Sequence, residues 1–515
     1  MKELTFHRWL LHTAERKATN IAFVDQTVPE DVSTHVERSL RLAAALAAQG
    51  VRQGDRVAIA ADASRFYINF MHAAALGGTI AVPVNTRLTV PELAALLAEC
   101  EPAVVVTDTA HCGAVELALK ELPVPPVVVL TDGETADGHL GLAELAASAE
   151  PVVPPEPEED TPLLMLHTGG TSGVPKGALT NNRQLLLQLY RQHVMIRSMD
   201  DGMTVLSVNP LFHIGGCFNA AYGFPGVGNT VVMRPSFDPD LAVADAAAHP
   251  ITHLPVVVSV LQRILDHPAF DAEAFASLRY IMYGASPIPP KLLARVVQTF
   301  PGVEVQQNYG MTETLGAVTC LTMADHQRGG DLLGSVGRVC LGVHLTIRDS
   351  AGAEVPTGAV GEICIASGST ATRYWHSPEE PGQAWLATGD VGRFDEDGYL
   401  YVVDRLKDMI ITGGENVYSV EVERVMSRHP DVESAAVIGL PDPDWGERVH
   451  AVIRPRPGAA LTPAELIAYA RQSLAGYKLP KSIDIRSEPL PVSAVGKVLK
   501  RALREEHTSV KAERS

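Results

Sequence analysis

The sequence is short of cysteine and has no long uninterrupted apolar run. Its six cysteines are scattered over 515 residues with no CxxC pair, which argues against a disulfide framework or a zinc site and predicts a reducing compartment. No apolar run reaches about 18 residues, so no membrane span is expected. The first residues lack the apolar core and the small-residue cleavage site of a signal peptide. These absences together predict a cytoplasmic protein.

Positive charge is also in short supply. The chain has 42 Lys and Arg against 60 Asp and Glu, a net charge of −18. Nucleic acid and anionic membranes both require a basic footprint, so neither is expected as the main partner. Individual Lys or Arg side chains would therefore have to bind an anionic ligand.

What the sequence does contain is alternation of short strands and helices. A chain of 515 residues is too long for one core, so at least two domains are expected. The runs DRVAIAA (55–61) and TIAVPVN (79–85) are typical of buried strands, and RFYINFMHAAALGG (65–78) and PELAALLAEC (91–100) are typical of helices. This alternation predicts a mostly parallel sheet covered by helices. The proline-rich, acidic segment 150–162 is interpreted as a linker or surface loop between two sub-domains.

The pattern of predicted secondary structure changes twice in the second half of the chain. From about residue 330, short alternating strands with Gly and Pro turns predict a small β-barrel, as in VGRVCLGVHLTIRD (336–349). Beyond residue 404, a helix at 420–430, further strand and helix patterns and a basic tail predict a separate small α+β domain.

The run HTGGTSGVPKG (167–177) stands directly after the apolar stretch LLML. A glycine-rich turn after a strand exposes consecutive backbone N–H groups, and such a nest binds phosphate oxygens. The hydroxyl residues and Lys176 add donors and charge. The P-loop motif is absent, because Pro175 rather than glycine precedes Lys176. A plain surface loop is the alternative interpretation, and the preceding strand and the lysine favour a phosphate-binding loop.

Three further stretches support a nucleotide site. In NYGMTET (308–314), Tyr309 is suited to stack on a base, Thr312 to bond a phosphate and Glu313 to hold Mg²⁺. Asp390, in ATGD (387–390), is suited to accept from both ribose hydroxyls, and VGKVLKR (495–501) carries Lys497 in the basic tail.

In this order, these segments closely resemble the adenylate-forming superfamily, which includes acyl-CoA synthetases, firefly luciferase and peptide-synthetase adenylation domains. The resemblance extends over nearly the whole chain, and DRLKDMIITGGENVYSVEVE (404–423) and YKLPK (477–481) resemble the acyl- and aryl-CoA synthetase branch. It implies two half-reactions. A carboxylate attacks the α-phosphate of ATP to give an acyl-adenylate and pyrophosphate, and a thiol, commonly that of CoA, then displaces AMP.

The resemblance also implies roles for single residues. Thr312 would contact the α-phosphate, Glu313 would bind Mg²⁺, and Lys497 would bridge the attacking carboxylate and the α-phosphate, offsetting charge that gathers there. His213, in NPLFHIGG (209–216), would line or gate the acyl pocket, although a lone histidine beside apolar residues is usually a packed side chain. The remaining ATP-binding residues implied are Thr168, Gly169, Gly170, Thr171, Ser172 and Lys176 for the phosphates, Gly284, Ala285, Ser286, Asn308, Tyr309 and Gly310 for adenine, and Asp390 and Arg405 for ribose.

The implied fold is α/β, with a large N-terminal domain of two αβ sub-domains plus a small β-barrel, followed by a small, mobile α+β C-terminal domain. The boundaries expected are 1–403 (sub-domains about 1–160, 161–330 and 331–403), a hinge at 404–408 with Lys407 as the pivot, and 409–515. Rotation at the hinge would exchange Lys497 for Gly413 and Gly414, which leave room for a pantetheine arm. A charged surface turn is the alternative interpretation of 404–408.

The chain departs from the family pattern at two segments used for adenylation. Gly169 replaces a common serine and Ser172 a common threonine in the phosphate loop, and Val495 lacks the usual hydroxyl before Gly-Lys. One lost hydrogen bond to a charged group slows a step by roughly ten- to a hundredfold. The hypothesis that follows is weak adenylation, with a supplied acyl-adenylate as the better substrate; drift within the family is the simpler explanation. ATP–pyrophosphate exchange decides between them.

The stretch GGCFNAAYGFPGVG (215–228) bears on the acid, since half of its residues are Gly or Ala. Small residues leave volume for a bulky or long apolar acid, and close helix packing favours them equally. No Lys or Arg lies in this stretch to pair with a second carboxylate, so an apolar monocarboxylic acid is predicted.

The substrates predicted are therefore this acid, ATP or its acyl-adenylate, and CoA, with Mg²⁺ as cofactor. A homodimer is compatible with the sequence. A carrier-protein ligase, a thioesterification-only enzyme and a non-catalytic nucleotide-binding protein stay as alternatives, and nothing in the sequence argues for a luciferase-like oxygenase.

Overall fold

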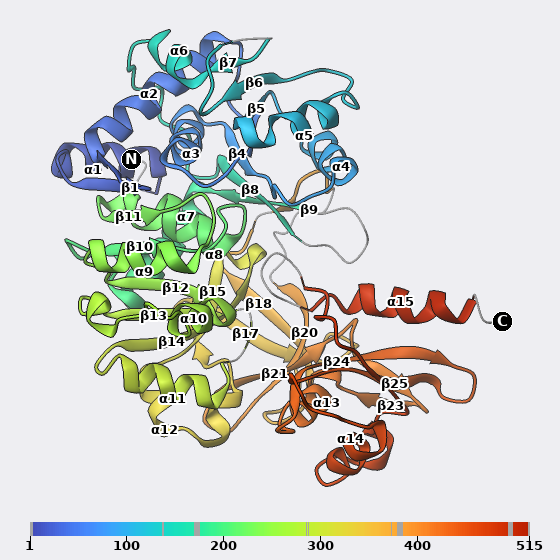
Figure 1. Cartoon of the computed structure of the whole chain (residues 1–515). Coiled ribbons are helices and arrows are strands. Elements are labelled where there is room, and N and C mark those ends of the chain that lie inside the picture. Colours follow the sequence, from blue (N-terminus) through green and yellow to red (C-terminus); the bar gives the residue numbers. More distant parts are fainter. Residues whose placement is uncertain are drawn as a thin grey trace. The chain divides into compact units, whose positions relative to one another are not determined.

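The computed structural model describes residues 4–135, 138–168, 176–284, 286, 288–371, 373–377, 385–492 and 498–512 (Figure 1). The chain divides into two compact units. Unit 1 holds Met1–Leu333, Val339–Val343 and Ala366–Ala384, and unit 2 holds Gly334–Arg338, His344–Ile365 and Trp385–Ser515. The domain boundaries expected at residues 403 and 409 stay predictions.

One sheet of unit 1 comes mainly from the first third of the chain. Its neighbouring strands β4, β3, β5, β6 and β7 run parallel, β8 is parallel to β4, and β9 and β19 add an antiparallel edge. In the described residues the order is β19 (Arg373–Tyr374), β9 (Lys176–Asn181), β8 (Pro162–Thr168), β4 (Ile80–Pro83), β3 (Arg56–Ala60), β5 (Val104–Thr107), β6 (Val127–Leu130) and β7 (Leu140–Gly141). The predicted parallel sheet is thus present.

Helices bury both faces of this sheet. Successive side chains of a strand point to opposite faces, and on β3 Val57 and Ile59 pack in one apolar core while Ala58 and Ala60 pack in another. The first core includes α2 (Val32–Ala48), α3 (Arg65–Gly77) and α6 (Leu142–Ala147), and the second includes α4 (Val90–Cys100) and α5 (Thr109–Leu119). The continuous apolar runs in the sequence follow from this double burial.

The second sheet of unit 1 joins segments far apart in the chain. Strand β1 pairs in parallel with β11, although about 200 residues separate them. Within the described residues the order is β16 (Arg338–Val339), β15 (Gly316–Leu321), β14 (Glu304–Met311), β13 (Tyr280–Gly284), β12 (His253–Val257), β10 (Thr204–Ser207), β11 (Thr230–Met233), β1 (Ile21–Asp25) and β2 (Val28–Asp31). One face packs against α9 (Pro239–Ala248), α10 (Val258–Leu265) and α11 (Pro290–Thr299).

The acidic, proline-rich segment before β8 is tied to the start of the chain. Glu156 accepts hydrogen bonds from Thr5 Oγ1 (2.5 Å) and Arg8 Nη2 (2.7 Å), at the N-terminus of α1 (Phe6–Lys17). Glu159 pairs with Arg183 of α7 (Asn182–Ile196), a helix that begins with a capping box of Asn181 and Gln184. Glu156 and Glu159 therefore tie the segment to α1 and α7 of unit 1.

Unit 2 contains two further sheets. The strands predicted for the barrel form a four-stranded sheet in the described residues, in the order β17 (Val343–Arg348), β18 (Gly361–Ser367), β20 (Leu386–Phe394) and β21 (Leu400–Arg405). The other sheet has β23 (Glu415–Val417), β22 (Ile410–Thr412), β25 (Gly446–Pro455) and β24 (Val432–Asp442), with β26 (Ser482–Ile485) beside β25. The helices with these sheets are α13 (Ser419–Met426), α14 (Pro463–Ala470) and α15 (Lys500–Ala512).

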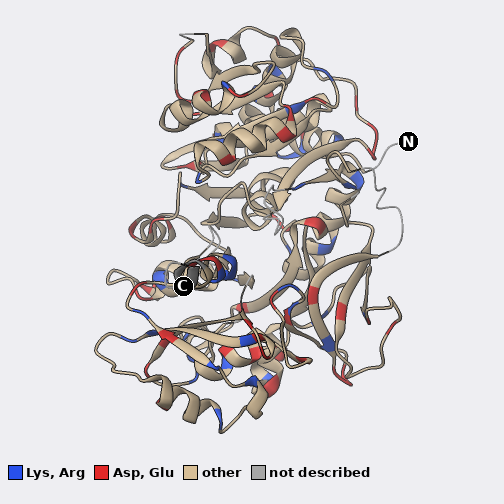
Figure 2. Cartoon of the chain, turned by 90° about the vertical axis from the view of Figure 1, so that its right-hand side faces the viewer, with Lys and Arg blue, Asp and Glu red and all other residues tan. Residues whose placement is uncertain are grey.

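Two sequence-based exclusions can be compared with the structure. No helix among the described residues has both the length and the apolar character needed to cross a bilayer. The six cysteines are all free thiols. In the view of Figure 2, Lys and Arg are interspersed with Asp and Glu along the elements.

Candidate active site

The predicted phosphate loop connects two paired strands of unit 1. Thr168 ends β8 and Lys176 begins β9, and the two residues are register partners, with Thr168 Oγ1 donating to the Lys176 carbonyl (3.4 Å). The ends of the loop are therefore held side by side. Its predicted donors Gly169, Gly170, Thr171 and Ser172 lie outside the described residues.

The residue before the loop is held from another helix. His167 Nε2 lies 2.9 Å from Glu99 Oε2 near the end of α4, and the His167 side chain is only 6% exposed. Because a carboxylate oxygen accepts, the Nε2 nitrogen carries the proton in this contact. This contact holds the end of β8, from which the loop starts.

The predicted adenine site lies at the ends of two parallel strands. Gly284 of β13 is the register partner of Asn308 of β14, and a Cβ atom at Gly284 would lie 2.7 Å from the Asn308 carbonyl oxygen. Glycine therefore permits this close approach. The Asn308 Oδ1 atom is buried and finds no hydrogen-bond partner among the described residues, so it fits an amino donor such as that of adenine. Ser286 is exposed, and Ala285 lies outside the described residues.

A tight reversal after β14 presents the two residues predicted for the α-phosphate and the metal. A Cβ atom at Gly310 would lie 1.8 Å from the Gly316 carbonyl oxygen, so only glycine fits there. The turn Thr312–Thr314 follows, and Thr314 Oγ1 accepts from the Met311 backbone N–H (3.0 Å). Thr312 is half-buried and Glu313 is buried.

Sequence reasoning missed Tyr374, which contacts both of these segments. Its hydroxyl donates to Glu313 Oε1 (2.7 Å), and the Lys176 ammonium lies 5.4 Å from its ring centroid. Burial and the negative charge of Glu313 raise the pKa of the Tyr374 hydroxyl above its usual range, which keeps it a donor. The pairing of β19 with β9 brings the tyrosine here. No local motif marks it, because the contact depends on residues about 60 and 200 positions away.

The Glu313 carboxylate fits the magnesium role. Carboxylate oxygens are the ligands that Mg²⁺ prefers, and Mg²⁺ is bound through one or two carboxylates plus substrate phosphates. Tyr374 orients this carboxylate as an outer partner orients a metal ligand.

His213 begins the segment predicted for the acyl pocket. Its Nδ1 accepts from the Gly215 backbone N–H (3.3 Å) at the start of α8 (Ile214–Gly216), which leads into a π-helix, Cys217–Gly223. Gly216 is explained by close packing, since a Cβ atom there would lie 2.2 Å from the Pro210 carbonyl. The β10 crevice beside this segment is lined by Val205, Ser207, Val208, Asn209, Gly215, Gly216, Asn219, Ala220 and Pro255.

Unit 2 carries the residues predicted for ribose, hinge and thiol. Asp390 and Arg405 are register partners on β20 and β21, with Arg405 Nε 2.9 Å from Asp390 Oδ1. Lys407 is exposed between the buried Asp404 and Asp408.

Gly413 and Gly414 form the two-residue turn between β22 and β23, with φ of 60° and 83°. The positive φ values explain why both are glycines. Lys497 lies outside the described residues, as does Val495.

A family model described as AMP-binding enzyme matches residues 10–375, and one described as AMP-binding enzyme C-terminal domain matches residues 421–497. The chain belongs to the AMP-binding enzyme family. The resemblance expected from the motifs is thereby confirmed.

Relatives of this AMP-binding enzyme differ in acid and acceptor. Fatty acid–[acyl-carrier-protein] ligase ScoC of Streptomyces coeruleorubidus is 36% identical over 477 residues, which cover 91% of this chain and 89% of that protein. Feruloyl-CoA synthase of an Amycolatopsis species is 35% identical over 471 residues, covering 91% and 92%. The structure of ATP-bound MatB from Rhodopseudomonas palustris matches with a TM-score of 0.88 at 28% identity, covering 99% and 100%.

These findings decide two of the predictions. The α/β fold class of this AMP-binding enzyme is confirmed. Its assignment as an enzyme, an AMP-forming acid–thiol ligase, is also confirmed. The roles of individual site residues, Mg²⁺ and the homodimer stay predictions.

Proposed function

We propose that this AMP-binding enzyme is an acyl-CoA ligase that converts an apolar monocarboxylic acid to its CoA thioester through an acyl-adenylate. The observation that carries the proposal is the junction at Tyr374. Its hydroxyl binds Glu313 and its ring lies beside Lys176, so the metal-binding turn and the base of the phosphate loop share one side chain. This arrangement suits a nucleoside triphosphate.

In the first half-reaction, a carboxylate oxygen of the acid bonds to the α-phosphorus of ATP, and the bond to pyrophosphate breaks. Thr168 and Lys176 hold the phosphates, Tyr309 and Gly284 flank adenine, and Asp390 and Arg405 bind ribose. Glu313 would hold Mg²⁺, which when bound would neutralise charge on the phosphate oxygens. Lys497 stabilises the charge that develops on the α-phosphate.

The acid is proposed to bind at the β10 crevice, which is narrow in this structure and has to widen to admit it. Val205, Ala220 and Pro255 supply apolar surface, and Ser207, Asn209 and Asn219 are the polar side chains among its lining residues. No Lys or Arg is among the lining residues found in the described chain, which favours an acid with a single carboxylate.

In the second half-reaction, the thiol sulfur bonds to the acyl carbon and AMP leaves. A swing at Lys407 is proposed to bring Gly413 and Gly414 to the thiol. The flanks of this hinge are bound to the helix that follows Lys497. Arg504 Nη2 pairs with Asp408 Oδ1 (2.8 Å), and Lys500 Nζ donates to Ser419 Oγ (2.6 Å), which in turn donates to Asp404. Movement of the hinge and of α15 is therefore linked.

A carrier-protein acceptor is the second candidate. It is favoured by the relative named as a fatty acid–[acyl-carrier-protein] ligase, which is 36% identical. Free CoA and a phosphopantetheinylated carrier protein, offered separately, distinguish the two acceptors.

The test is a panel of acids scored by release of AMP. Medium- and long-chain fatty acids and aryl acids are expected to give AMP with ATP, Mg²⁺ and CoA, whereas acetate and dicarboxylates are expected to give little. ATP–pyrophosphate exchange with the best acid tests whether adenylation is weak. Activity confined to acetate or dicarboxylates, or AMP release with no acid of the panel, contradicts the proposal.

Replacing Asp390 with asparagine is expected to raise the KM for ATP by about 10- to 100-fold, because hydrogen bonds from ribose to a charged acceptor are lost. Arg405 is 44% exposed, so water can solvate it once its partner is neutral, and little loss of folding stability is expected. Steady-state kinetics with ATP varied measures the effect. The exposed Asp349, replaced in the same way, is the control. An unchanged KM for ATP argues against the ribose role.

A further inference from the structure

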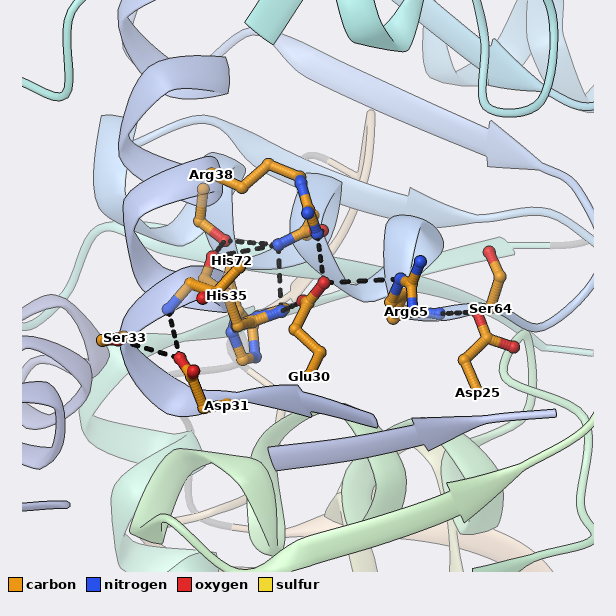
Figure 3. Close-up of polar contacts among 12 residues, drawn as sticks. Asp25, Glu30, Asp31, Ser33, His35, Arg38, Ser64, Arg65 and His72 are labelled. Atoms are coloured by element: carbon orange, nitrogen blue, oxygen red, sulfur yellow. Dashed lines mark hydrogen bonds and ion pairs between the residues drawn. The ribbon is translucent and has the colours of Figure 1, made fainter. Parts of the chain in front are cut away.

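A chain of buried polar side chains connects β2, α2 and α3 (Figure 3). Glu30, His35 and His72 come from β2, α2 and α3 in turn, and each is at least nine-tenths buried. His35 Nε2 lies 2.9 Å from His72 Nδ1, and His72 Nε2 lies 2.6 Å from the carbonyl oxygen of Ala221. Buried polar groups are retained only where their partners satisfy them.

The protons of this chain are determined by its last acceptor. A carbonyl oxygen only accepts, so His72 carries its proton on Nε2. Its Nδ1 then accepts, which requires the proton of His35 on Nε2. His35 Nδ1 in turn accepts from Asn69 Nδ2 (2.9 Å). The orientation of the Asn69 amide follows from the His35 carbonyl (3.0 Å to Nδ2) and Arg38 (3.3 Å to Oδ1).

Both histidines are neutral in this arrangement. Burial, together with the neighbouring His35, lowers the pKa of His72 well below its usual value, and burial lowers the pKa of His35. The charge of Glu30 is met by Arg38 and by Arg65, whose Nε lies 3.3 Å away, and His35 Nδ1 lies 3.3 Å from its Oε1. His72 therefore delivers one directed hydrogen bond from a rigid support.

The acceptor of that bond belongs to the π-helix Cys217–Gly223. In an α-helix the Ala221 carbonyl would accept from the residue four positions on, but that residue is Pro225, which has no N–H. Pro225 thus excludes the α-helical bond, and His72 donates to this carbonyl. The adjacent residues Asn219 and Ala220 line the β10 crevice, and Tyr222 packs edge-on against Phe6 (5.0 Å between ring centroids).

We infer that His72 is a positioning residue for acid binding: through the Ala221 carbonyl it holds the π-helix in the shape that forms one wall of the β10 crevice. The inference rests on the proposed function, in which that crevice receives the acid. His72 touches no reacting atom in this scheme. It acts on the affinity for the acid and not on the nucleotide.

Three variants of the full-length enzyme test this role. His72→Phe keeps an aromatic ring but removes the donor. His72→Gln keeps a donor for Ala221 and an acceptor for His35. His7→Phe is the matched control, because His7 is also buried and its Nδ1 lies 3.1 Å from a carbonyl of α3, that of Leu76, instead of a carbonyl of the π-helix.

For His72→Phe, we expect the KM for the acid to rise about tenfold and the KM for ATP to change less than twofold. His72→Gln should stay within about threefold of wild type for the acid. Hydrogen exchange followed by mass spectrometry should show peptides within 214–227 exchanging about tenfold faster in His72→Phe than in His7→Phe.

The outcomes separate the inference from the proposed function. If both Phe variants shift the two KM values alike, or if exchange within 214–227 is unchanged, the positioning role is overturned. If the wild type releases AMP with no acid of the panel, the proposed function fails and the role in acid binding fails with it. The exchange data then decide by themselves whether His72 holds the π-helix.

Discussion

Replacing Lys497 with alanine is expected to slow acyl-adenylate formation by about 10²–10³-fold, because one preorganised charge is removed from the position where negative charge develops. Thioester formation from a supplied acyl-adenylate should change less than about tenfold, since the α-phosphate is then already esterified. The residue lies outside the described part of the chain, so this prediction rests on the VGKVLKR segment and on family membership.

The two half-reactions are measured separately. ATP–pyrophosphate exchange reports adenylation, and release of AMP from a synthetic acyl-adenylate in the presence of CoA reports thioester formation. Lys291→Ala is the control, because Lys291 is an exposed lysine of α11. Equal losses in both half-reactions would contradict the assignment of Lys497 to adenylation alone.

Glu313→Gln is expected to lower kcat/KM for ATP by about 100-fold, with part of the activity restored at higher Mg²⁺ concentration. Glutamine has the size of glutamate and keeps an oxygen that can accept from Tyr374, so the fold should be preserved while the charge is lost. Activity as a function of Mg²⁺ concentration measures the effect.

Tyr374→Phe provides a graded comparison for the same site. It keeps the ring beside Lys176 and removes only the hydroxyl that orients Glu313, so a loss of about tenfold in apparent Mg²⁺ affinity is expected. If Glu313→Gln leaves the Mg²⁺ dependence unchanged, Glu313 is not the metal ligand. If Tyr374→Phe is as severe as Glu313→Gln, the hydroxyl does more than orient the carboxylate.

Local patterns in the sequence predicted the layers of unit 1 well. The run RVAIA forms β3, and the helical stretch after it forms α3. A strand buried on both faces is a continuous apolar run, and a helix has apolar residues at helical spacing, so both can be recognised in the sequence. The same reasoning did not identify α15, whose Glu506 pairs with Arg486 just after β26 and whose Arg504 pairs with Asp408 of the hinge, 96 positions away.

The residues of the candidate site also fall into two groups, those that the sequence predicts and those that only the structure reveals. The glycine at 310 and the turn that carries Thr312 and Glu313 can be predicted from NYGMTET, because the geometry of this turn depends on neighbouring residues. Tyr374 is not readable, because it reaches Glu313 only through the pairing of β19 with β9. The small residues of 215–228 were open to two interpretations. Gly215 and Gly216 both line the crevice, and Gly216 also packs closely against the Pro210 carbonyl.

The sequence by itself determined the family, the alternating α/β layers and the order of the nucleotide-binding segments, because each of these depends on residues that are contiguous in the chain. Only the tertiary structure decided that β1 and β2 join a sheet built from residues beyond 200, and that His35 and His72 meet behind the π-helix. Such contacts depend on which distant surfaces pack together. Neither residue of a pair carries a local mark of its partner, so the folded chain alone reveals them.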